Sequence, residues 1–111
     1  MSLILRTINP DIIENWMMAV ARFSKLLKEA FGGSIVGVYA SESPEFGIGD
    51  YNVVVVLSTS VSDDIVERVI EIAGEACKRL NVTIVPKVVS NKDIEGKIYV
   101  ETMEGAGIKI L

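Results

Sequence analysis

The first third of the chain alternates apolar and polar positions with the period of a helix. Residues 9–11, Asn-Pro-Asp, form a typical helix start, with a capping amide, a proline at the first helical position and an acid after it. Apolar residues then recur every three or four positions, at Ile12, Ile13, Trp16, Met17, Val20, Phe23, Leu27, Ala30 and Phe31. The glycine pair at 32 and 33 ends the pattern. We therefore expect one long helix over residues 10–31.

Two runs rich in β-branched residues follow the glycine pair and are separated by a polar turn. Residues 35–40 predict a first strand, and residues 51–57 predict a second one whose four consecutive valines indicate burial on both faces. Asp50 and Asn52 lie where this second strand begins. Because side chains alternate along a strand, we expect both to project to one face, close to the turn that carries Ser43.

The next segment predicts a second helix and a third strand. Ser60 or Ser62 can cap the helix, and Asn81 is a typical left-handed stop. The apolar side of this helix consists of Ile65, Val66, Val69, Ile70, Ala73, Ala76, Cys77 and Leu80. Residues 82–89 predict the strand, and Pro86 indicates that it lies at a sheet edge or bends there.

The end of the chain combines conflicting signals. Residues 90–104 begin like a capped helix but continue with a run of strand propensity, and we expect a short, imperfect helix. Two glycines then lead into a last strand at residues 108–111. Together the elements predict one domain over residues 1–111. Its class is α/β (α+β), with a small mixed β-sheet and helices packed mainly on one face.

Composition and charge narrow the classes of partner. The net charge is -4 and no basic run occurs, so general nucleic-acid binding, which needs a phosphate-neutralising surface, is not expected. No apolar run approaches the ~20 residues of a membrane span, and the apolar part of the N-terminal segment is too short for a signal peptide. We expect a cytoplasmic protein that does not bind membranes. The single cysteine, Cys77, has no internal disulfide partner and, on the apolar side of a helix, is expected to be inert.

The absence of histidine excludes catalytic triads that depend on it, and also the ordinary zinc sites. If the chain carries out chemistry, the acidic start of the second strand is the place for it. Taken by itself, residues 48–52 form an ordinary turn in which the Asn52 side chain is solvated.

The order of elements resembles the minimal nucleotidyltransferases of the DNA-polymerase-β-like superfamily. In that family a strand runs into Gly-Ser and a basic turn, and the next strand carries the metal-binding motif Asp-x-Asp. Val38 and Tyr39 occupy the end of the first strand here, and Ser43 falls where the family serine holds a nucleotide phosphate. Gly47 matches the turn glycine, and Asp50 matches the first metal ligand. The resemblance implies a nucleotidyltransferase-like fold with Ser43 and Gly47 as nucleotide-binding residues.

The turn departs from the family pattern. Glu42 stands where the family has the glycine that lets the backbone approach a phosphate, and it adds a negative charge there. Pro44 and Phe46 replace basic residues, and the turn is shorter than in the family.

The metal-binding positions depart further. Asn52 replaces the second aspartate as the candidate ligand beside Asp50, and Thr83 or Val85 stands where a third carboxylate is expected. Two-metal transfer needs several anionic oxygens, which one carboxylate and one amide do not supply. We therefore expect weak or absent Mg²⁺ binding and impaired catalysis, with Asp50 as the catalytic residue if any activity remains.

Three functions follow from the resemblance. The first is a divergent member that acts as a nucleotide-binding or protein-interaction module. The second is an active Mg²⁺-dependent transferase that moves NMP from an NTP to a protein or small molecule. The third is an interaction subunit without a ligand, similar to the antitoxin role that some minimal nucleotidyltransferases have beside a helical partner.

The high apolar content of so short a chain predicts a homodimer or a helical protein partner. Half of the residues are hydrophobic, and a small domain leaves much of its surface exposed. Trp16, Met17 and Met18 widen the apolar stripe of the first helix beyond one face. The last strand is a second candidate surface, because it can pair edge to edge.

Overall fold

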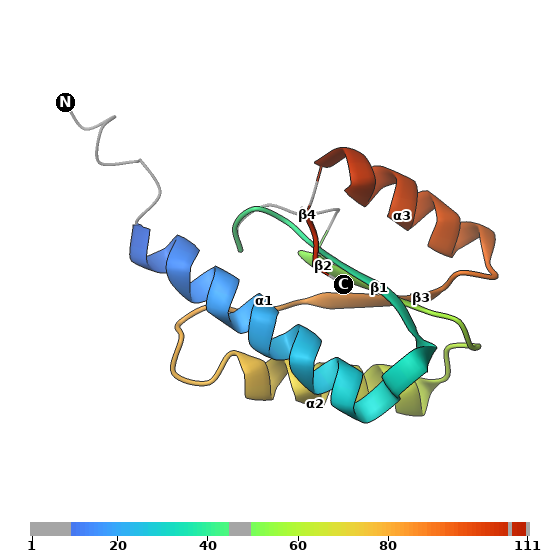
Figure 1. The fold of residues 1–111 in the computed structure, drawn as a ribbon, viewed down its shortest axis with the longest axis horizontal. Helices are drawn as coiled ribbons and strands as arrows, with labels where there is room; N and C mark the ends of the chain where they lie inside the picture. The colour runs from blue at the N-terminus through green and yellow to red at the C-terminus, as the bar shows by residue number, and fades with distance from the viewer. Residues whose placement is uncertain (1–9, 45–49, 107, 111) are drawn as a thin grey trace.

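A computed structural model describes residues 10–44, 50–106 and 108–110 of the chain. Its elements, in chain order, are α1 (Pro10–Phe31), the short 3₁₀ helix η2 (Gly32–Ser34), β1 (Ile35–Ala40), β2 (Val53–Leu57), α2 (Asp63–Ala76), β3 (Pro86–Ser90), α3 (Ile94–Ala106) and β4 (Ile108–Lys109). The strands form one mixed sheet in the order β3-β2-β1-β4 (Figure 1). Strands β2 and β3 are parallel, whereas β1 is antiparallel to both of its neighbours.

The sheet lies between two layers of helices. Helices α1 and α2 pack on one face, and α3 covers the other (Figure 1). The valines of β2 alternate between the layers: Val53 and Val55 join the α1 and α2 side, and Val54 and Val56 join the α3 side. The predicted burial of this strand on both faces is confirmed. So is the α/β class, with the two longest helices on one face.

The α1 helix spans the predicted residues. Only some of the apolar side chains expected on its stripe are buried against the sheet. Trp16 and Phe23 are buried, whereas Met17 and Met18 are 65% and 47% exposed. The indole N–H of Trp16 donates to the Ser41 carbonyl at 2.8 Å, which holds the ring inside. Of the three residues expected to widen the apolar stripe beyond one face, Trp16 therefore lies in the core, whereas Met17 and Met18 lie on the surface.

The boundaries of α2 differ from those expected. The helix begins after Ser62, whose hydroxyl accepts from the Ile65 N–H at 3.3 Å, so Ser60 is not the cap. It ends at Ala76, earlier than predicted. A run of turns follows, in which Arg79 and Asn81 have φ of 66° and 52°, so the left-handed conformation expected at Asn81 is confirmed.

Three strands are shorter than predicted. Strand β2 begins at Val53 rather than at residue 51. Strand β3 begins at Pro86 rather than at residue 82, and it lies at an edge of the sheet, as the proline indicated. Proline has no N–H to donate, so an edge or the first position of a strand accommodates it. Strand β4 is limited to residues 108–109, and the last expected strand residue, 111, lies outside the described part of the chain.

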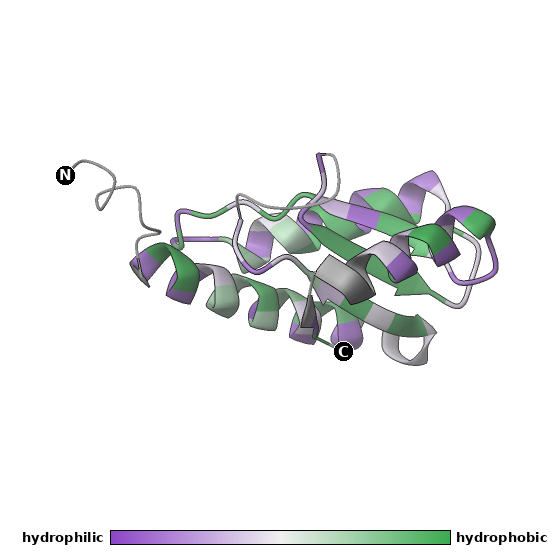
Figure 2. Ribbon diagram, turned by 90° about the horizontal axis from the view of Figure 1, so that it is seen from above, coloured by the Kyte–Doolittle hydropathy of each residue, from purple (hydrophilic) through white to green (hydrophobic). Residues whose placement is uncertain are grey.

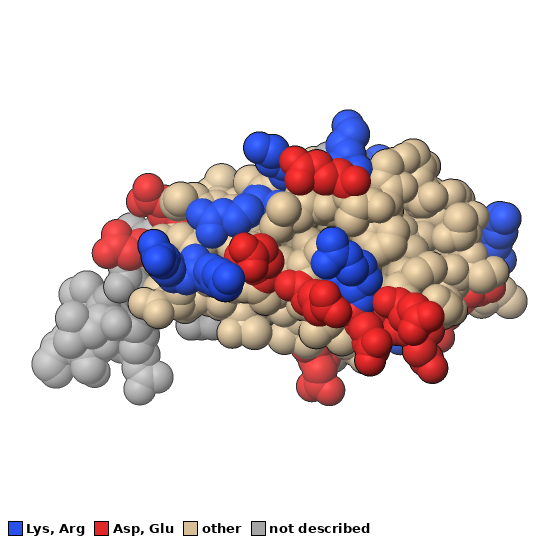
Figure 3. Space-filling model, turned by 90° about the horizontal axis from the view of Figure 1, so that it is seen from below, with Lys and Arg blue, Asp and Glu red and all other residues tan. Residues whose placement is uncertain are grey.

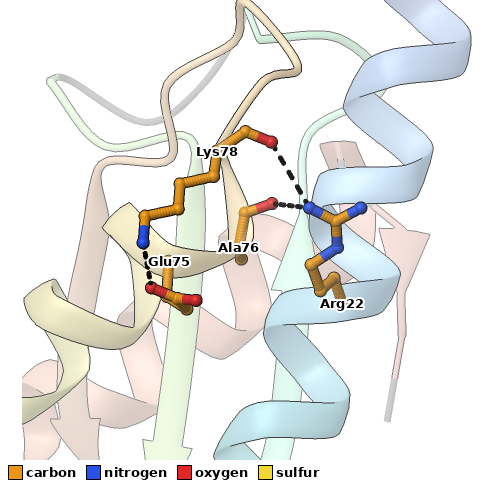
Figure 4. Close-up of polar contacts among 4 residues, drawn as sticks. All are labelled: Arg22, Glu75, Ala76 and Lys78. Atoms are coloured by element: carbon orange, nitrogen blue, oxygen red, sulfur yellow. Dashed lines mark hydrogen bonds and ion pairs between the residues drawn. The ribbon is translucent and has the colours of Figure 1, made fainter.

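An arginine on α1 holds the end of α2 (Figure 4). Arg22 Nη1 donates to the carbonyls of Ala76 and Lys78, both at 3.4 Å. The last carbonyls of a helix lack partners within it, and a cation at this end also complements the helix dipole. Lys78 forms an ion pair with Glu75 at 3.1 Å beside this contact, but both side chains are exposed and the pair contributes little.

The surface carries mixed charge. Basic and acidic side chains are interspersed over the face formed by α1 and α2 (Figure 3). Apolar and polar residues alternate along the helices, while the strands between them are largely apolar (Figure 2). Within the described residues, no helix is long and apolar enough to cross a membrane.

Helix α3 packs closely against the end of β3 at a glycine. Gly96 is buried, and a Cβ at this position would collide with the backbone carbonyl of Ser90, the last residue of β3. That carbonyl also accepts from the Asp93 N–H at 3.2 Å, which fixes the turn between β3 and α3. Only glycine allows this contact between helix and strand.

We predict that Gly96→Ala destabilises the fold, because β3 or α3 must shift to make room for the methyl group. The expected loss is about 1–3 kcal/mol in the free energy of unfolding, measured from the urea midpoint. Gly74→Ala in α2 is the matched control, since nothing lies within 4 Å of its added Cβ. That variant should gain up to about 1 kcal/mol from helix propensity. Equal stability of Gly96→Ala and the wild type would contradict the close packing of α3.

Candidate functional site

The segment before β2 is organised around the buried side chain of Asn52, which is 6% exposed. Its amide Nδ2 donates to the carbonyls of Thr83 at 2.9 Å and Pro44 at 3.2 Å. Its Oδ1 accepts from the Val85 N–H at 2.8 Å. The Asn52 side chain therefore forms hydrogen bonds both with the segment that follows β1 and with the segment that precedes β3.

Backbone hydrogen bonds extend this arrangement on both sides. The Asn52 N–H donates to the Val85 carbonyl at 3.1 Å, so Val85 is held by both the backbone and the side chain of Asn52. On the other side, the Ser41 N–H donates to the Asn52 carbonyl at 3.0 Å. Trp16 donates to Ser41 in turn, so the network reaches from α1 across β1 and β2 to the start of β3.

Asp50 lies in a different environment from Asn52. Both precede β2, which begins at Val53, and Asp50 is an exposed turn residue. The prediction that both residues lie on the strand is therefore wrong, because the strand begins only at Val53. The Asn52 amide is buried among three backbone partners, whereas Asp50 lies in the turn before it. The alternative prediction of a solvated Asn52 is also wrong.

The turn that carries Ser43 lies against Asn52, as expected, through the contact with Pro44. Ser43 is 1% exposed, and its hydroxyl has no hydrogen-bond partner among the residues that the structure describes. Its carbonyl accepts from the Ser41 hydroxyl at 2.7 Å, which fixes the turn. Gly47 lies outside the described residues, so its predicted contact with a nucleotide stays a prediction, as does that of Ser43.

The described residues around Asn52 fit a catalytic Mg²⁺ site poorly. Mg²⁺ requires several oxygen ligands near octahedral geometry, but the Asn52 oxygen is already bonded to an N–H. Thr83 and Val85, at the position expected for a third carboxylate, contribute backbone atoms to the Asn52 network. Across the part of the chain that is described, no three His, Cys, Asp or Glu side chains gather as metal ligands do. Metal binding by Asp50 and Asn52 stays a prediction.

A second polar cluster, between β3 and α3, was not predicted. Lys87 Nζ lies 5.5 Å and 5.7 Å from the ring centroids of Tyr51 and Tyr99, and 3.0 Å from Glu95 Oε1. The hydrogen bond to Glu95 raises the pKa of Lys87 above its ordinary value. The alternation of β3 could have revealed the cluster, because it places Lys87 on the face opposite the buried Val88. A charged side chain on an edge strand also opposes pairing with another sheet.

Cys77 follows the last turn of α2 and is half-buried. Burial raises the pKa of its thiol, and this effect outweighs a backbone hydrogen bond from Ile84 and the positive charge of Arg22. A raised pKa reduces the thiolate that would act as a nucleophile. The expectation of an unreactive thiol agrees with this environment.

Comparison with known proteins assigns no family: no family model, curated protein or solved structure matches the chain. The resemblance to minimal nucleotidyltransferases thus depends on the residues of the turn and on the order of the elements. What the described site can do chemically follows from its own geometry. Among the described residues it offers two exposed carboxylates, at Glu42 and Asp50, and a buried amide at Asn52 that is bonded to the backbone.

We predict that Asn52→Asp loses about 2–4 kcal/mol of stability at about pH 7, because a carboxylate cannot donate to the Pro44 and Thr83 carbonyls. Those carbonyls should raise the pKa of the new carboxyl in the folded state. The loss of stability is then smallest below ~pH 4, the pKa of the carboxyl in the unfolded chain. It grows as the pH rises through the higher pKa of the same carboxyl in the folded protein. Urea unfolding at about pH 4 and about pH 7 measures it.

Asn91→Asp is the matched control for this substitution, because Asn91 is exposed. It should change stability by less than about 0.5 kcal/mol at either pH. If Asn52→Asp instead kept wild-type stability and gained thermal stability from added Mg²⁺, the side chain would face a metal site rather than the backbone.

Proposed function

We propose that this domain is a non-catalytic interaction module with a nucleotidyltransferase-like fold, and that it binds another protein chain through an exposed face of α1. The proposal combines two groups of observations. One concerns the segment before β2, where transfer chemistry is expected. The other concerns the surface of α1.

The geometry before β2 supports a structural use of the positions that resemble catalytic ones. The Asn52 amide is bonded to three backbone groups, and the Ser43 hydroxyl is buried. A phosphate at this turn would have to displace packed atoms to reach that hydroxyl. Asp50 is the remaining matched carboxylate, and a single carboxylate does not fix two metal ions about a reacting phosphate.

The observation that carries the proposal is the exposed methionine face of α1, made of Ile13, Met17, Met18 and Ala21. Met17 and Met18 are 65% and 47% exposed, although α1 has an apolar face of its own inside the fold. Contiguous exposed apolar surface is typical of interaction sites, and methionine adapts its shape to different partners. The face therefore provides a surface for another protein.

A groove adjoins the methionine face and enlarges the apolar surface. It encloses about 250 Å³. Its lining comprises Trp16, Met17, Val20, Ala21, Ala40, Ser41, Glu42 and Ile110. The groove thus lies between α1, the end of β1 and the residue after β4, where a partner side chain can insert beside the helix.

We predict no nucleotide transfer from any of the four NTPs in the presence of Mg²⁺ or Mn²⁺. The matched carboxylates are too few to hold the metal ions that transfer requires. The assay incubates the full chain, alone and with cell extract, with radiolabelled NTPs and measures label on protein and small molecules. Labelling of the wild type that Asp50→Ala abolishes would overturn the proposal in favour of the alternative, an active Mg²⁺-dependent transferase.

We also predict that the double variant Met17→Lys/Met18→Lys folds with unchanged stability and is more soluble than the wild type. Surface substitutions that break no packing change stability by less than about 0.5 kcal/mol. The control for the double variant is Ile70→Lys on α2. Ile70 is also exposed (54%), but it lies outside the methionine face. Urea unfolding and ammonium sulfate precipitation measure the two effects. A stability loss above about 1 kcal/mol would show that the methionines pack within their own fold.

A further inference from the structure

One exposed line of residues along α1 carries opposite charges at its two ends. Glu14, Met18, Ala21 and Lys25 are all exposed, and their spacings of four, three and four residues place them along one side of the helix. These are the spacings of the core positions of a coiled coil. We call these four residues the outward line of α1.

The outward line is complementary to itself when two helices run in opposite directions. If the midpoint between Met18 and Ala21 lies on a two-fold axis, Met18 faces the partner subunit's Ala21, a large side chain against a small one. The same register brings Glu14 to the partner subunit's Lys25, and it does so twice because the contact is symmetric. A parallel pair would instead place like charges opposite each other, which is unfavourable.

The charges of the outward line are not used within the described structure. Neither Glu14 nor Lys25 forms an ion pair with another described residue. Glu14 also lines a shallow apolar hollow with Ile13, Met17, Met18 and Ala21. Apolar surface with a charged residue at its rim is the usual composition of a protein interface.

We infer that the partner of the methionine face is a second copy of this chain, bound through an antiparallel α1 pair with Glu14 opposite the partner's Lys25. This inference rests on the proposed function, in which α1 binds a protein. One helix pair buries a small interface, so the dimer should be weak and concentration-dependent, with a dissociation constant on the order of micromolar or higher.

Sedimentation equilibrium of the full chain tests the register through charge reversal. Glu14→Lys and Lys25→Glu should each weaken dimerisation about tenfold, because each replaces two attractive contacts by two like-charge contacts. The combined variant Glu14→Lys/Lys25→Glu should return to within about twofold of the wild type, since the charges are complementary again. Added salt should weaken the wild-type dimer and strengthen self-association of each single variant.

Glu67→Lys on α2 is the control, because it makes the same charge change at an exposed position outside the outward line. It should leave dimerisation unchanged. Circular dichroism confirms that each variant is folded. A monomeric wild type at all concentrations up to ~1 mM, well above a micromolar constant, would overturn the inference. So would a combined variant as weak as the single ones, or a dimer that resists Glu14→Lys. None of these outcomes depends on nucleotide transfer, which tests the proposed function separately.

Discussion

The buried amide of Asn52 is the interaction on which the arrangement of the strands depends. It bonds the carbonyls of Pro44 and Thr83 and the N–H of Val85, which belong to segments far apart in the sequence. A buried polar group is costly unless it is bonded, so the buried Asn52 amide depends on these three backbone partners. The amide satisfies them together, and the approach of β3 to β2 is fixed before the regular ladder begins.

The two faces of β2 transmit this constraint to the helices. The alternating valines contact α1 and α2 on one side and α3 on the other. Strand β2 therefore has β1 and β3 beside it in the sheet and a layer of helices on each face. Trp16 adds a direct bond from α1 to Ser41, next to Asn52. On the opposite side, the close contact of Gly96 with the Ser90 carbonyl places α3. Shifting β2 would therefore disturb both layers.

Local patterns in the sequence predict much of this fold. The period of α1, the valines of β2, the edge position at Pro86 and the left-handed Asn81 all follow from the properties of a few neighbouring residues. The site is harder to predict, because the Asn52 bonds span 31 and 33 residues. Nothing near Asn52 in the sequence indicates which carbonyls its amide will meet. The exposure of Met17 beside the buried Trp16 likewise depends on where the sheet lies, which helical period alone leaves open.

The chemistry at position 52 also limits what the turn before β2 can do. An amide is suited to this position because it donates to two carbonyls and accepts from one N–H, a combination that an ionised carboxylate cannot provide. A second metal-binding carboxylate here would place a negative charge against the oxygens of Pro44 and Thr83. An aspartate at position 52 is therefore incompatible with the two hydrogen bonds that the Asn52 amide donates here. The surface that we propose for binding is that of α1, where the exposed side chains of Met17 and Met18 lie beside the charged Glu14 and Lys25.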